Sequence, residues 1–194
     1  MHPDHAVAAA HPRPDGGAAR PLRRLNGPGA TDPKRSFAPI VGGGPRALVL
    51  GTLPGEESLR QVRYYAHPRN LFWPIIFALF GQPLSDDYEQ RVDFVRARRL
   101  ALWDVCAAAE RHTSLDTAIK REIPNPIHAL LDAHPAITTI AFNGGTARRL
   151  YDRHFKRRAG LTYLHLPSTS PAHASRSFAE KLALWQPLRD ALGD

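Results

Sequence analysis

Short apolar segments alternate with segments of helical pattern along residues 45–194, and this alternation constrains the fold more than any other feature of the chain. Strands are expected at 47–50, 100–105, 136–142 and 161–166, and helices at 71–80, 85–98, 125–133, 147–155 and 175–192. Strands that are separated by helices pair in parallel, and the helices then cover both faces of the sheet. The sequence therefore predicts a three-layer α/β domain whose central parallel sheet has about four strands.

Local signals support several of these elements. The segment 136–142 is rich in β-branched residues, which favour strands. Gly81 follows the first apolar helix and is a common helix stop. Ser85 is suited to cap the next helix, and Asn125 followed by Pro126 is typical of a helix start.

Residues 1–44 differ in character from the rest of the chain. They are rich in Pro, Gly, Ala and Arg and show no sustained periodicity. Such a segment cannot bury enough apolar surface to offset the entropy of ordering it. We therefore expect a disordered basic tail at 1–44 and a single domain at 45–194. The tail either adds sequence-independent attraction to phosphates or is a solvated extension without a function, and the sequence leaves both interpretations open.

Charge and cysteine content limit the partners and the compartment. The 26 Lys and Arg residues exceed the 18 Asp and Glu residues and give a net charge of +8. This balance suits a polyanionic partner, although a basic tail on an ordinary enzyme would produce it too. The single cysteine, Cys106, can form no internal disulfide and cannot hold an iron–sulfur cluster, which needs about four thiolates. No apolar run reaches the ~20 residues of a membrane span, and the N-terminus lacks the pattern of a secretory signal. We expect a cytoplasmic protein of the bacterial type that is associated with the nucleoid.

Three loops of unusual composition follow expected strands. They are Gly51–Gly55, Asn143–Gly145 and Leu166–Ala172. Ligands of open α/β sheets bind beyond the carboxyl ends of the strands, so the three loops are expected to converge there. The first loop is soon followed by Tyr64–Pro74, which contains two tyrosines, an arginine and an asparagine before an aromatic helix start. An enzyme that extrudes a base from DNA needs such groups: a flat ring to stack on the base, an amide to handle it and a cation near the phosphate.

The same segments carry a family resemblance. Gly51–Gly55 resembles the first motif of the uracil-DNA glycosylase superfamily, and Tyr65–Trp73 is similar to the stretch that follows this motif in the mismatch-specific and hypoxanthine-acting branches. Leu166–Ala172 resembles the second motif, a Pro-Ser loop. Together these segments are most similar to the hypoxanthine-DNA (deoxyinosine) glycosylase family, and the resemblance extends over residues 45–192.

The resemblance implies a monofunctional DNA glycosylase with a uracil-DNA glycosylase-like fold. Such an enzyme flips a deaminated base out of the duplex and hydrolyses its N-glycosidic bond in base excision repair. Hypoxanthine is the main expected substrate, and uracil is the alternative. Its expected partner is DNA that contains a deaminated base, it is expected to act as a monomer, and no metal or redox cofactor is expected. A mismatch-specific uracil/thymine-DNA glycosylase and a non-catalytic nucleic-acid-binding α/β domain are the alternatives.

The resemblance implies that Asn70 is the catalytic residue. Its amide can donate to the leaving base or orient a water molecule. Other branches of the superfamily carry a carboxylate or an asparagine just before the proline of the first motif, but this chain has Leu53 there, which can do neither. The alternative interpretation is that Asn70 caps the helix that begins at Leu71, because asparagine is a favoured helix cap.

Base recognition is assigned by the resemblance to Tyr65 and Asn143, with Leu53 in the same pocket. The ring of Tyr65 would stack on the flipped base, an interaction worth about 1–3 kcal/mol, whereas Tyr64 suits a place in the core. The amide of Asn143 offers one acceptor and two donors, so it can read the edge of hypoxanthine or uracil. The alternative for Asn143 is turn chemistry, because Asn-Gly is a common turn signal.

Contacts with the DNA backbone are expected from the two motif loops and one arginine. These DNA-binding residues are Pro54, Gly55, Arg69, Ser168, Thr169, Ser170 and Pro171. Leu166 stands where most branches have a polar residue, which predicts a more apolar base pocket. His67 and His173 receive no catalytic role, and the ten histidines show no metal-ligand spacing.

Overall fold

A computed structural model describes residues 33–111 and 119–193 of the chain. At its centre lies a parallel four-stranded sheet with the strand order β3-β2-β6-β7. The strands are β2 (Ala47–Gly51), β3 (Leu100–Asp104), β6 (Thr139–Asn143) and β7 (Thr162–Leu166). The predicted α/β class with a central parallel sheet is confirmed, and each strand overlaps its expected segment.

The amino acids of the strands explain their burial. Every residue of β2, β3 and β6 is buried, and most of them are aliphatic or aromatic. Strands that are covered on both faces need such continuous apolar runs. The strand β7 lies at one edge of the sheet, and only its last residue, Leu166, is buried.

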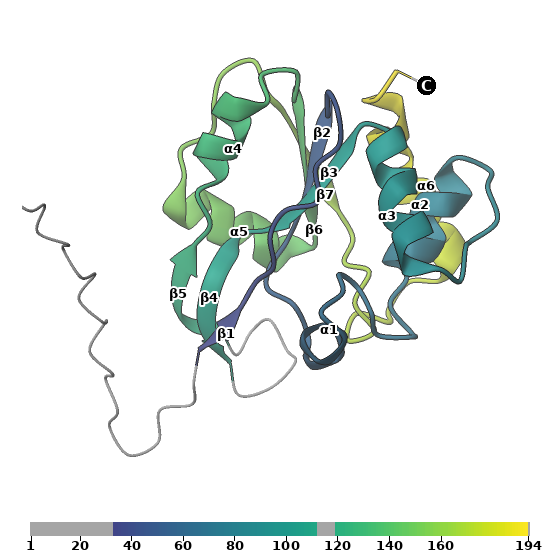
Figure 1. Ribbon diagram of the computed structural model, residues 1–194, viewed down its shortest axis with the longest axis horizontal. Coiled ribbons are helices and arrows are strands. Elements are labelled where there is room, and N and C mark those ends of the chain that lie inside the picture. Colours follow the sequence, from purple (N-terminus) through teal and green to yellow (C-terminus); the bar gives the residue numbers. More distant parts are fainter. Residues whose placement is uncertain (1–32, 112–118, 194) are drawn as a thin grey trace, which may run out of the picture. The chain divides into compact units, whose positions relative to one another are not determined.

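Two groups of helices cover the sheet (Figure 1). One face carries α2 (Phe72–Leu79), α3 (Tyr88–Ala97) and α6 (Phe178–Asp190), and the other face carries α4 (Ile127–Ala133) and α5 (Gly145–His154). On the first face, Phe72 of α2 meets Trp185 of α6 edge to face, with the ring centroids 6.0 Å apart. Both side chains are fully buried, so aromatic packing joins these two helices beneath the loops described below.

The helix starts follow their capping residues. The helix α6 begins with a capping box, in which the Ser177 hydroxyl accepts from the backbone of Glu180 and the Glu180 carboxylate accepts from the backbone of Ser177. The helix α3 is capped by Asp87 and not by Ser85, because the Asp87 carboxylate accepts from the backbone N–H of Gln90 at 2.9 Å. The Ser85 hydroxyl instead accepts from the backbone N–H of Asp87 at 3.1 Å and so stabilises the turn before the helix.

A second sheet and a short helix have no clear signal in the sequence. The strands β1 (Lys34–Arg35), β4 (Cys106–Arg111) and β5 (Ile119–Pro124) form an antiparallel sheet in the order β1-β4-β5, and α1 (Glu56–Gln61) follows β2. The pairing of β4 with β5 shifts register between Cys106 and Ala108 and again between Ala108 and Glu110. Such irregularities disturb the two-residue alternation by which a strand is recognised.

The folded unit starts earlier than the boundary at residue 45 that composition suggests. Lys34 and Arg35 pair with β4, and Ile40 is buried in the core at 8% exposure. Ile40 also exchanges two backbone hydrogen bonds with Leu102, each of 2.9 Å, and so covers the outer edge of β3. A segment without periodicity of its own can thus be ordered by pairing with existing strands. Residues 1–32 of the expected tail lie outside the described residues.

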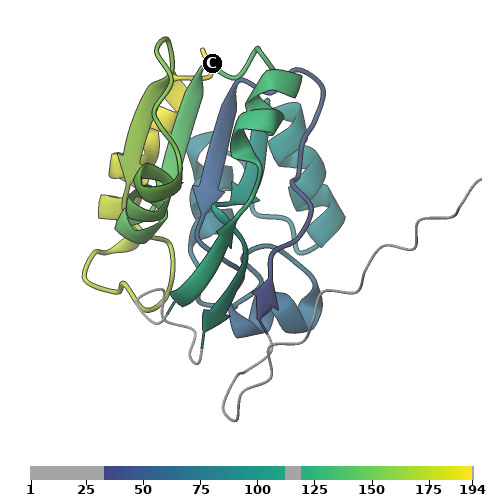
Figure 2. The same ribbon diagram turned by 90° about the vertical axis from the view of Figure 1, so that its left-hand side faces the viewer.

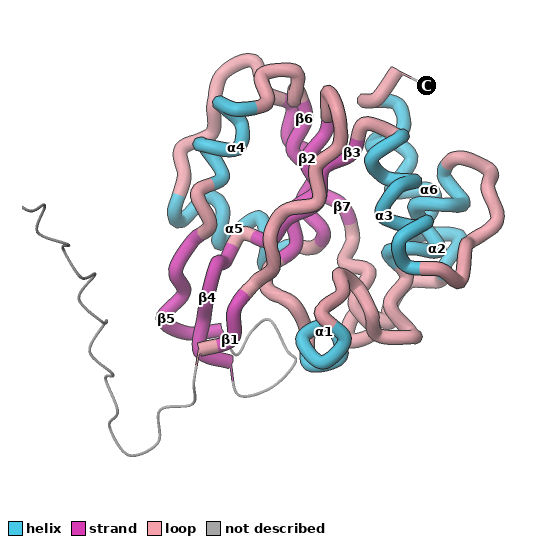
Figure 3. The backbone as a smooth tube through the Cα atoms, in the orientation of Figure 1, coloured by secondary structure: helices cyan, strands magenta, loops and turns pink. Residues whose placement is uncertain are grey.

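The carboxyl ends of the parallel strands share one edge of the sheet, which is the lower edge in Figure 1. The loops that follow β2 and β7 run to this edge, and α1 lies beside them (Figures 2 and 3). The loop after β6 is short, because α5 begins at Gly145. This edge therefore collects the chain segments in which the sequence places the site.

Candidate functional site

A cavity of about 310 Å³ opens at the carboxyl edge of the sheet. It is lined by residues 51–58 and 168–171 and by Tyr64, Tyr65, His67, Asn70, Asp104 and Asn143. All three loops that the sequence singles out contribute to this lining. Their convergence follows from the parallel sheet, which brings the ends of β2, β6 and β7 to one place.

Asn70 lines the cavity and closes the turn that leads into α2, although the N-cap of this helix is Leu71 and not Asn70. Its Oδ1 accepts a hydrogen bond from the backbone N–H of Phe72 at 2.9 Å. This contact fixes the orientation of the amide, so that the Nδ2 amino group is the part that can donate to a ligand. The next backbone N–H, of Leu71, donates to the carbonyl of Thr169 at 3.0 Å and ties this segment to the loop after β7.

Tyr65 has an unusual backbone conformation in the cavity wall. Its φ is 55°, in the left-handed region that a large side chain rarely adopts. The ring stacks on Phe72 with the centroids 3.9 Å apart and 20° between the ring planes. One face of the ring is therefore covered, and a base can stack only on the other face. Backbone strain of this kind is concentrated at functional sites.

Tyr64 belongs to the core, as the sequence suggests, although it reaches the cavity wall. It is buried, and its hydroxyl donates to the backbone carbonyl of Phe37 at 3.3 Å. Burial raises the pKa of the Tyr64 hydroxyl, and the nearby carboxylate of Asp104 raises it further. Tyr64 therefore stays protonated at any physiological pH.

Asn143 lies at the end of β6 with its amide held by Thr169 at two points. Its Oδ1 accepts from the backbone N–H of Thr169 at 2.9 Å, and its Nδ2 donates to the Thr169 hydroxyl, also at 2.9 Å. The Nδ2 group carries a second hydrogen, which is the one that could read a base. The adjacent Gly144 has a φ of 100°, and a methyl group there would lie 3.0 Å from the Cβ of Ser168. This segment therefore forms a turn at Gly144 and also contributes Asn143 to the cavity wall.

Leu53, Pro54 and Gly55 all line the cavity. Leu53 is 6% exposed, so it supplies an apolar wall at the place where other branches carry a polar group. Leu166 is also buried but lies outside the lining.

The loop after β7 is held from beneath by α6. The indole Nε1 of Trp185 donates to the carbonyl of Pro167 at 3.0 Å, and the ammonium of Lys181 donates to the carbonyl of His173 at 2.8 Å. Lys181 is only 2% exposed, and burial lowers the pKa of its ammonium. Between these two anchors, residues 168–171 face the cavity.

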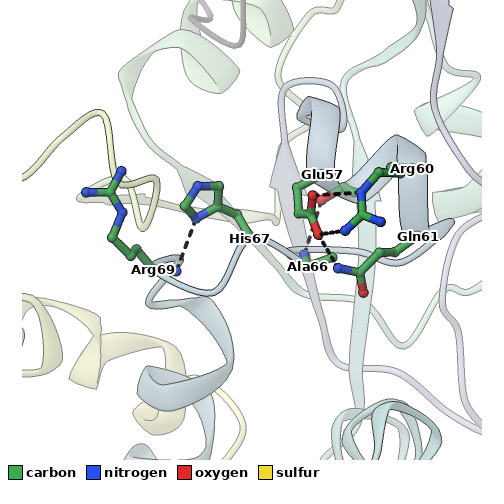
Figure 4. Close-up of polar contacts among 7 residues, drawn as sticks. Glu57, Arg60, Gln61, Ala66, His67 and Arg69 are labelled. Atoms are coloured by element: carbon green, nitrogen blue, oxygen red, sulfur yellow. Dashed lines mark hydrogen bonds and ion pairs between the residues drawn. The ribbon is translucent and has the colours of Figure 1, made fainter.

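His67 lines the cavity, whereas Arg69 is exposed and lies outside the lining, and the two residues are joined by a hydrogen bond (Figure 4). The backbone N–H of Arg69 donates to Nδ1 of His67 at 3.1 Å. A nitrogen that accepts a hydrogen bond carries no proton, so the neutral His67 ring has its proton on Nε2. The cation expected near phosphate therefore stands outside the cavity, and His67 adds a donor within its wall.

The helix α1 contributes two acidic residues that the sequence analysis does not single out. The Glu57 carboxylate accepts from Arg60 Nε at 3.0 Å and from the amide of Gln61 (Figure 4). The Arg60 contact holds the pKa of Glu57 below its usual value. Glu56 forms an ion pair with Lys34 of β1. Lys34 and Arg60 thus offset these two charges at the cavity.

Asp104 is a third acidic residue of the lining, and it is 3% exposed. It ends β3 at the same sheet edge as the three motif loops. Ligands of open α/β sheets bind beyond the carboxyl ends of the strands, and Asp104 is a polar residue at the carboxyl end of the predicted strand 100–105. The sequence could therefore have indicated Asp104 as a site residue in the same way as the three loops.

Among the residues that the structure describes, no group of three or more His, Cys, Asp or Glu side chains is placed to hold a metal ion. Within the same residues, no helix is both long enough and apolar enough to cross a membrane.

Comparison with protein families assigns the fold. Residues 39–189 match the model of the uracil DNA glycosylase superfamily. The chain belongs to this superfamily. A solution NMR structure from Methanosarcina acetivorans, named as a candidate uracil DNA glycosylase, matches with a TM-score of 0.73 and 31% sequence identity and covers 84% of this chain and 100% of that chain.

Two relatives carry the name hypoxanthine DNA glycosylase. The protein from Methanosarcina barkeri is 37% identical over 112 residues, which are 57% of this chain and 71% of the relative. The protein from Methanosarcina acetivorans is 35% identical over 141 residues, which are 72% of this chain and 88% of the relative. The resemblance that rests on the three motif segments is thereby confirmed, while the roles of single residues in this superfamily member stay predictions.

Proposed function

We propose that this superfamily member is a monofunctional DNA glycosylase that removes hypoxanthine from DNA by hydrolysis. The observation that carries the proposal is the cavity, because it brings Asn70, Asn143 and Tyr65 together with residues 168–171. These are the groups that a flipped nucleotide requires: amides for the base, a ring to stack on it and small polar residues for its phosphates. The names of the two Methanosarcina relatives support the choice of base.

The reaction breaks the bond between the sugar C1′ and the base nitrogen. The bonding electrons leave with the base, positive charge develops on the sugar, and a water oxygen then bonds to C1′. One proton of this water ends on the base, so the products are the free base and an abasic site. The enzyme must stabilise negative charge on the leaving base, and an oriented donor in a sheltered site does this well.

Asn70 is the proposed donor to the leaving base. Its Oδ1 is engaged by the backbone of Phe72, so the Nδ2 hydrogens are the ones presented to a ligand. Removal of a single donor of this kind typically lowers turnover by about 100- to 1,000-fold. The cavity-lining residues that the structure describes include no lysine, so the chemistry proposed here has no Schiff base and no lyase step.

Uracil is the second proposed substrate. Hypoxanthine and uracil share a carbonyl beside a ring N–H, so one set of donors and acceptors can recognise both. The likeness to the solution structure named for uracil DNA glycosylase favours this extension. We further propose that the protein acts as a monomer on DNA.

The test uses purified protein on oligonucleotides that carry inosine, uracil or xanthine, in single strands and opposite each normal base. Abasic sites are scored by strand cleavage in alkali, and the Asn70→Ala variant is the control for a contaminating glycosylase. The proposal expects abasic sites from inosine with the wild type and none with the variant. Binding of these oligonucleotides by a folded wild type that forms no abasic site would instead identify a non-catalytic DNA-binding domain.

A further inference from the structure

Val62 is the most exposed large apolar side chain among the residues that the structure describes, with 72% of its surface open to solvent. It directly follows α1, between residues 51–58 on one side and Tyr64 and Tyr65 on the other. Both of these stretches line the cavity, whereas Val62 does not. Val62 therefore stands on the rim of the site, where it contributes nothing to the core and has no part in the reaction proposed above.

The backbone of Val62 is strained. Its φ of 52° and ψ of 45° lie in the left-handed region, which is an outlier for a β-branched residue. The N–H of Val62 donates to the carbonyl of Leu59 at 3.4 Å, and the N–H of Arg63 donates to the carbonyl of Ser58 at 3.1 Å. Helices that end in this way usually carry glycine in the left-handed position. Glycine would thus serve the fold better than valine, and strain of this kind is concentrated at functional sites.

The chain is held firmly on both sides of Val62. The hydrogen bonds of the last turn of α1 fix the preceding side. On the following side, the N–H of Tyr64 donates to the hydroxyl of Tyr88 at 2.9 Å, and the carbonyl of Tyr64 accepts from the indole of Trp73 at 3.0 Å. The guanidinium of Arg63 lies over the ring of Tyr88, 5.1 Å from its centroid. Val62 is therefore an exposed apolar tip on a rigid support.

The surroundings of this tip suit a nucleic acid. Arg60 and Arg63 flank Val62 in the chain, and both are exposed. Arg60 also pairs with Glu57 in the cavity wall (Figure 4). Proteins that deform DNA commonly contact its phosphates with cations and insert an apolar side chain between the bases. Three residues span at most about 11 Å, so the Cα atom of Val62 lies within this distance of that of Tyr65, on which the flipped base is proposed to stack.

We propose that Val62 is the wedge that enters the DNA duplex when the damaged base leaves the stack. Its isopropyl group fills the gap, packs on the neighbouring bases and hinders the return of the flipped base. The proposal rests on the glycosylase function above and assigns the residue that maintains the flipped state in a duplex. The loop after β7 is less suited to this role, because Pro171 lines the cavity and Ala172 carries only a methyl group.

Val62→Gly tests the wedge. A duplex with 2-aminopurine beside inosine reports flipping directly, because the probe becomes brighter when its neighbour leaves the stack. The wild type should raise this fluorescence, and Val62→Gly should lose most of the rise. Single-turnover excision from a duplex should fall about 10-fold, as expected when the burial of a valine side chain is lost. Excision from a single strand should change little, because it has no duplex gap to fill. The melting temperature should stay equal or rise, because glycine adopts the left-handed conformation without strain.

Val62→Asn is a second variant with a side chain of similar size. Asparagine tolerates the left-handed region but is polar, so this variant should behave like Val62→Gly. Leu184→Ala is the matched control, because it shortens an apolar side chain that is 45% exposed on α6, a helix that contributes no residue to the cavity lining. It should keep the wild-type fluorescence and both excision rates.

Wild-type fluorescence and a wild-type duplex rate in folded Val62→Gly or Val62→Asn would overturn the proposal. Equal losses from duplex and single strand would overturn it too, because a general structural defect affects both substrates alike. The fluorescence needs no excision, so the two functions can fail separately. If the wild type brightens the probe through Val62 but releases neither hypoxanthine nor uracil from any oligonucleotide, the wedge stands and the glycosylase function fails.

Discussion

The amide of Asn70 serves the fold with its oxygen and is proposed to serve the chemistry with its nitrogen. The oxygen accepts from the backbone N–H of Phe72, the first residue of α2, and so holds the turn before this helix. Asn143 is divided in the same way, since one hydrogen of its amide holds Thr169 and the other is left for a base. Substitutions that keep one half of an amide and remove the other can therefore separate structure from function at both residues.

Asn70→Asp keeps the hydrogen bond from Phe72 N–H, because a carboxylate oxygen can accept it, but it removes the proposed donor to the base. We expect single-turnover excision to fall at least about 100-fold with little change in melting temperature. Asn70→Ala should lose excision as well, and loss of the hydrogen bond from Phe72 N–H should lower the free energy of unfolding by about 1 kcal/mol. Binding of DNA should survive in both variants. Near-normal excision by Asn70→Asp would restrict Asn70 to holding the turn before α2.

Asn143→Asp should likewise keep the brace on the loop. The Thr169 backbone N–H can still donate to the carboxylate, and the Thr169 hydroxyl can turn to donate to its second oxygen. The base would lose its donor and meet an acceptor, at a cost of about 1–3 kcal/mol, so release of hypoxanthine and of uracil should both fall. Thr169→Val is the control, because it removes the hydroxyl that accepts from Asn143 but keeps the Asn143 amide as a donor to the base. Wild-type rates and base ratio in Asn143→Asp would restrict Asn143 to bracing the loop.

The motif sequence points to Asn70, Asn143 and Tyr65 as site residues, and all three line the cavity. The sequence could not show that the Asn143 amide is engaged by Thr169, because these residues are 26 positions apart and no local pattern links them. The stacking of Tyr65 on Phe72 depends on a positive φ, which the amino acid type does not indicate.

At the scale of elements, the loop after β7 depends on α6. Lys181 and Trp185 each hold one carbonyl of this loop, and the two carbonyls flank the residues that face the cavity. The helix thus acts as a platform beneath the second motif. The amphipathic pattern predicts a helix at 175–192, which overlaps α6, but no sequence pattern indicates the tertiary contact of Lys181.

Lys181→Met tests this platform. Methionine fills the same space without a buried charge, which is costly to desolvate, so the melting temperature should stay equal or rise. The carbonyl of His173 loses its donor, and the loop that is proposed to hold phosphates should be less well ordered. We expect KM for inosine-containing DNA to rise several-fold while kcat changes little. Lys156→Met makes the same chemical change at an exposed site and should alter neither KM nor kcat. An unchanged KM in Lys181→Met would argue against a supporting role of α6 for this loop.

The four parallel strands were predictable because each is a short run of mainly apolar or β-branched residues. The strands β4 and β5 were not predictable, because register shifts interrupt the alternation of their side chains and because β4 consists of small residues followed by charged ones. The helix α1 is too short for a helical period to be recognised and follows a Pro-Gly turn that is read as loop. Regular patterns thus revealed the layers, while the irregular elements around the cavity depended on tertiary contacts.

At the scale of the whole molecule, the segment before β2 is part of the catalytic unit. Ser36 holds the Asp104 carboxylate, Lys34 pairs with Glu56, and Ile40 fills the core. Composition could not reveal this, because the segment has few apolar residues and no period, and it is ordered by the strands on which it lies.

Deletions at the N-terminus should separate these contributions. Removal of residues 1–32 should leave the melting temperature and the single-turnover rate unchanged. Removal of residues 1–44 should destabilise the protein strongly, since truncation of a buried isoleucine such as Ile40 alone costs about 2–5 kcal/mol. Thermal unfolding and excision of hypoxanthine by both deletions provide the readout. Equal melting temperatures for the two proteins would mean that residues 33–44 are dispensable for the fold.

The measurement that tests the central claim most directly is the quantity of free base released from DNA. Wild-type protein is incubated with a duplex that contains one inosine, and the released base and the abasic sites are both quantified. The account predicts one hypoxanthine for each abasic site, no strand cleavage without alkali, and release from the same duplex that is at least about 100-fold slower with Asn70→Asp. Release of no hypoxanthine by a folded protein that still binds the duplex would contradict it.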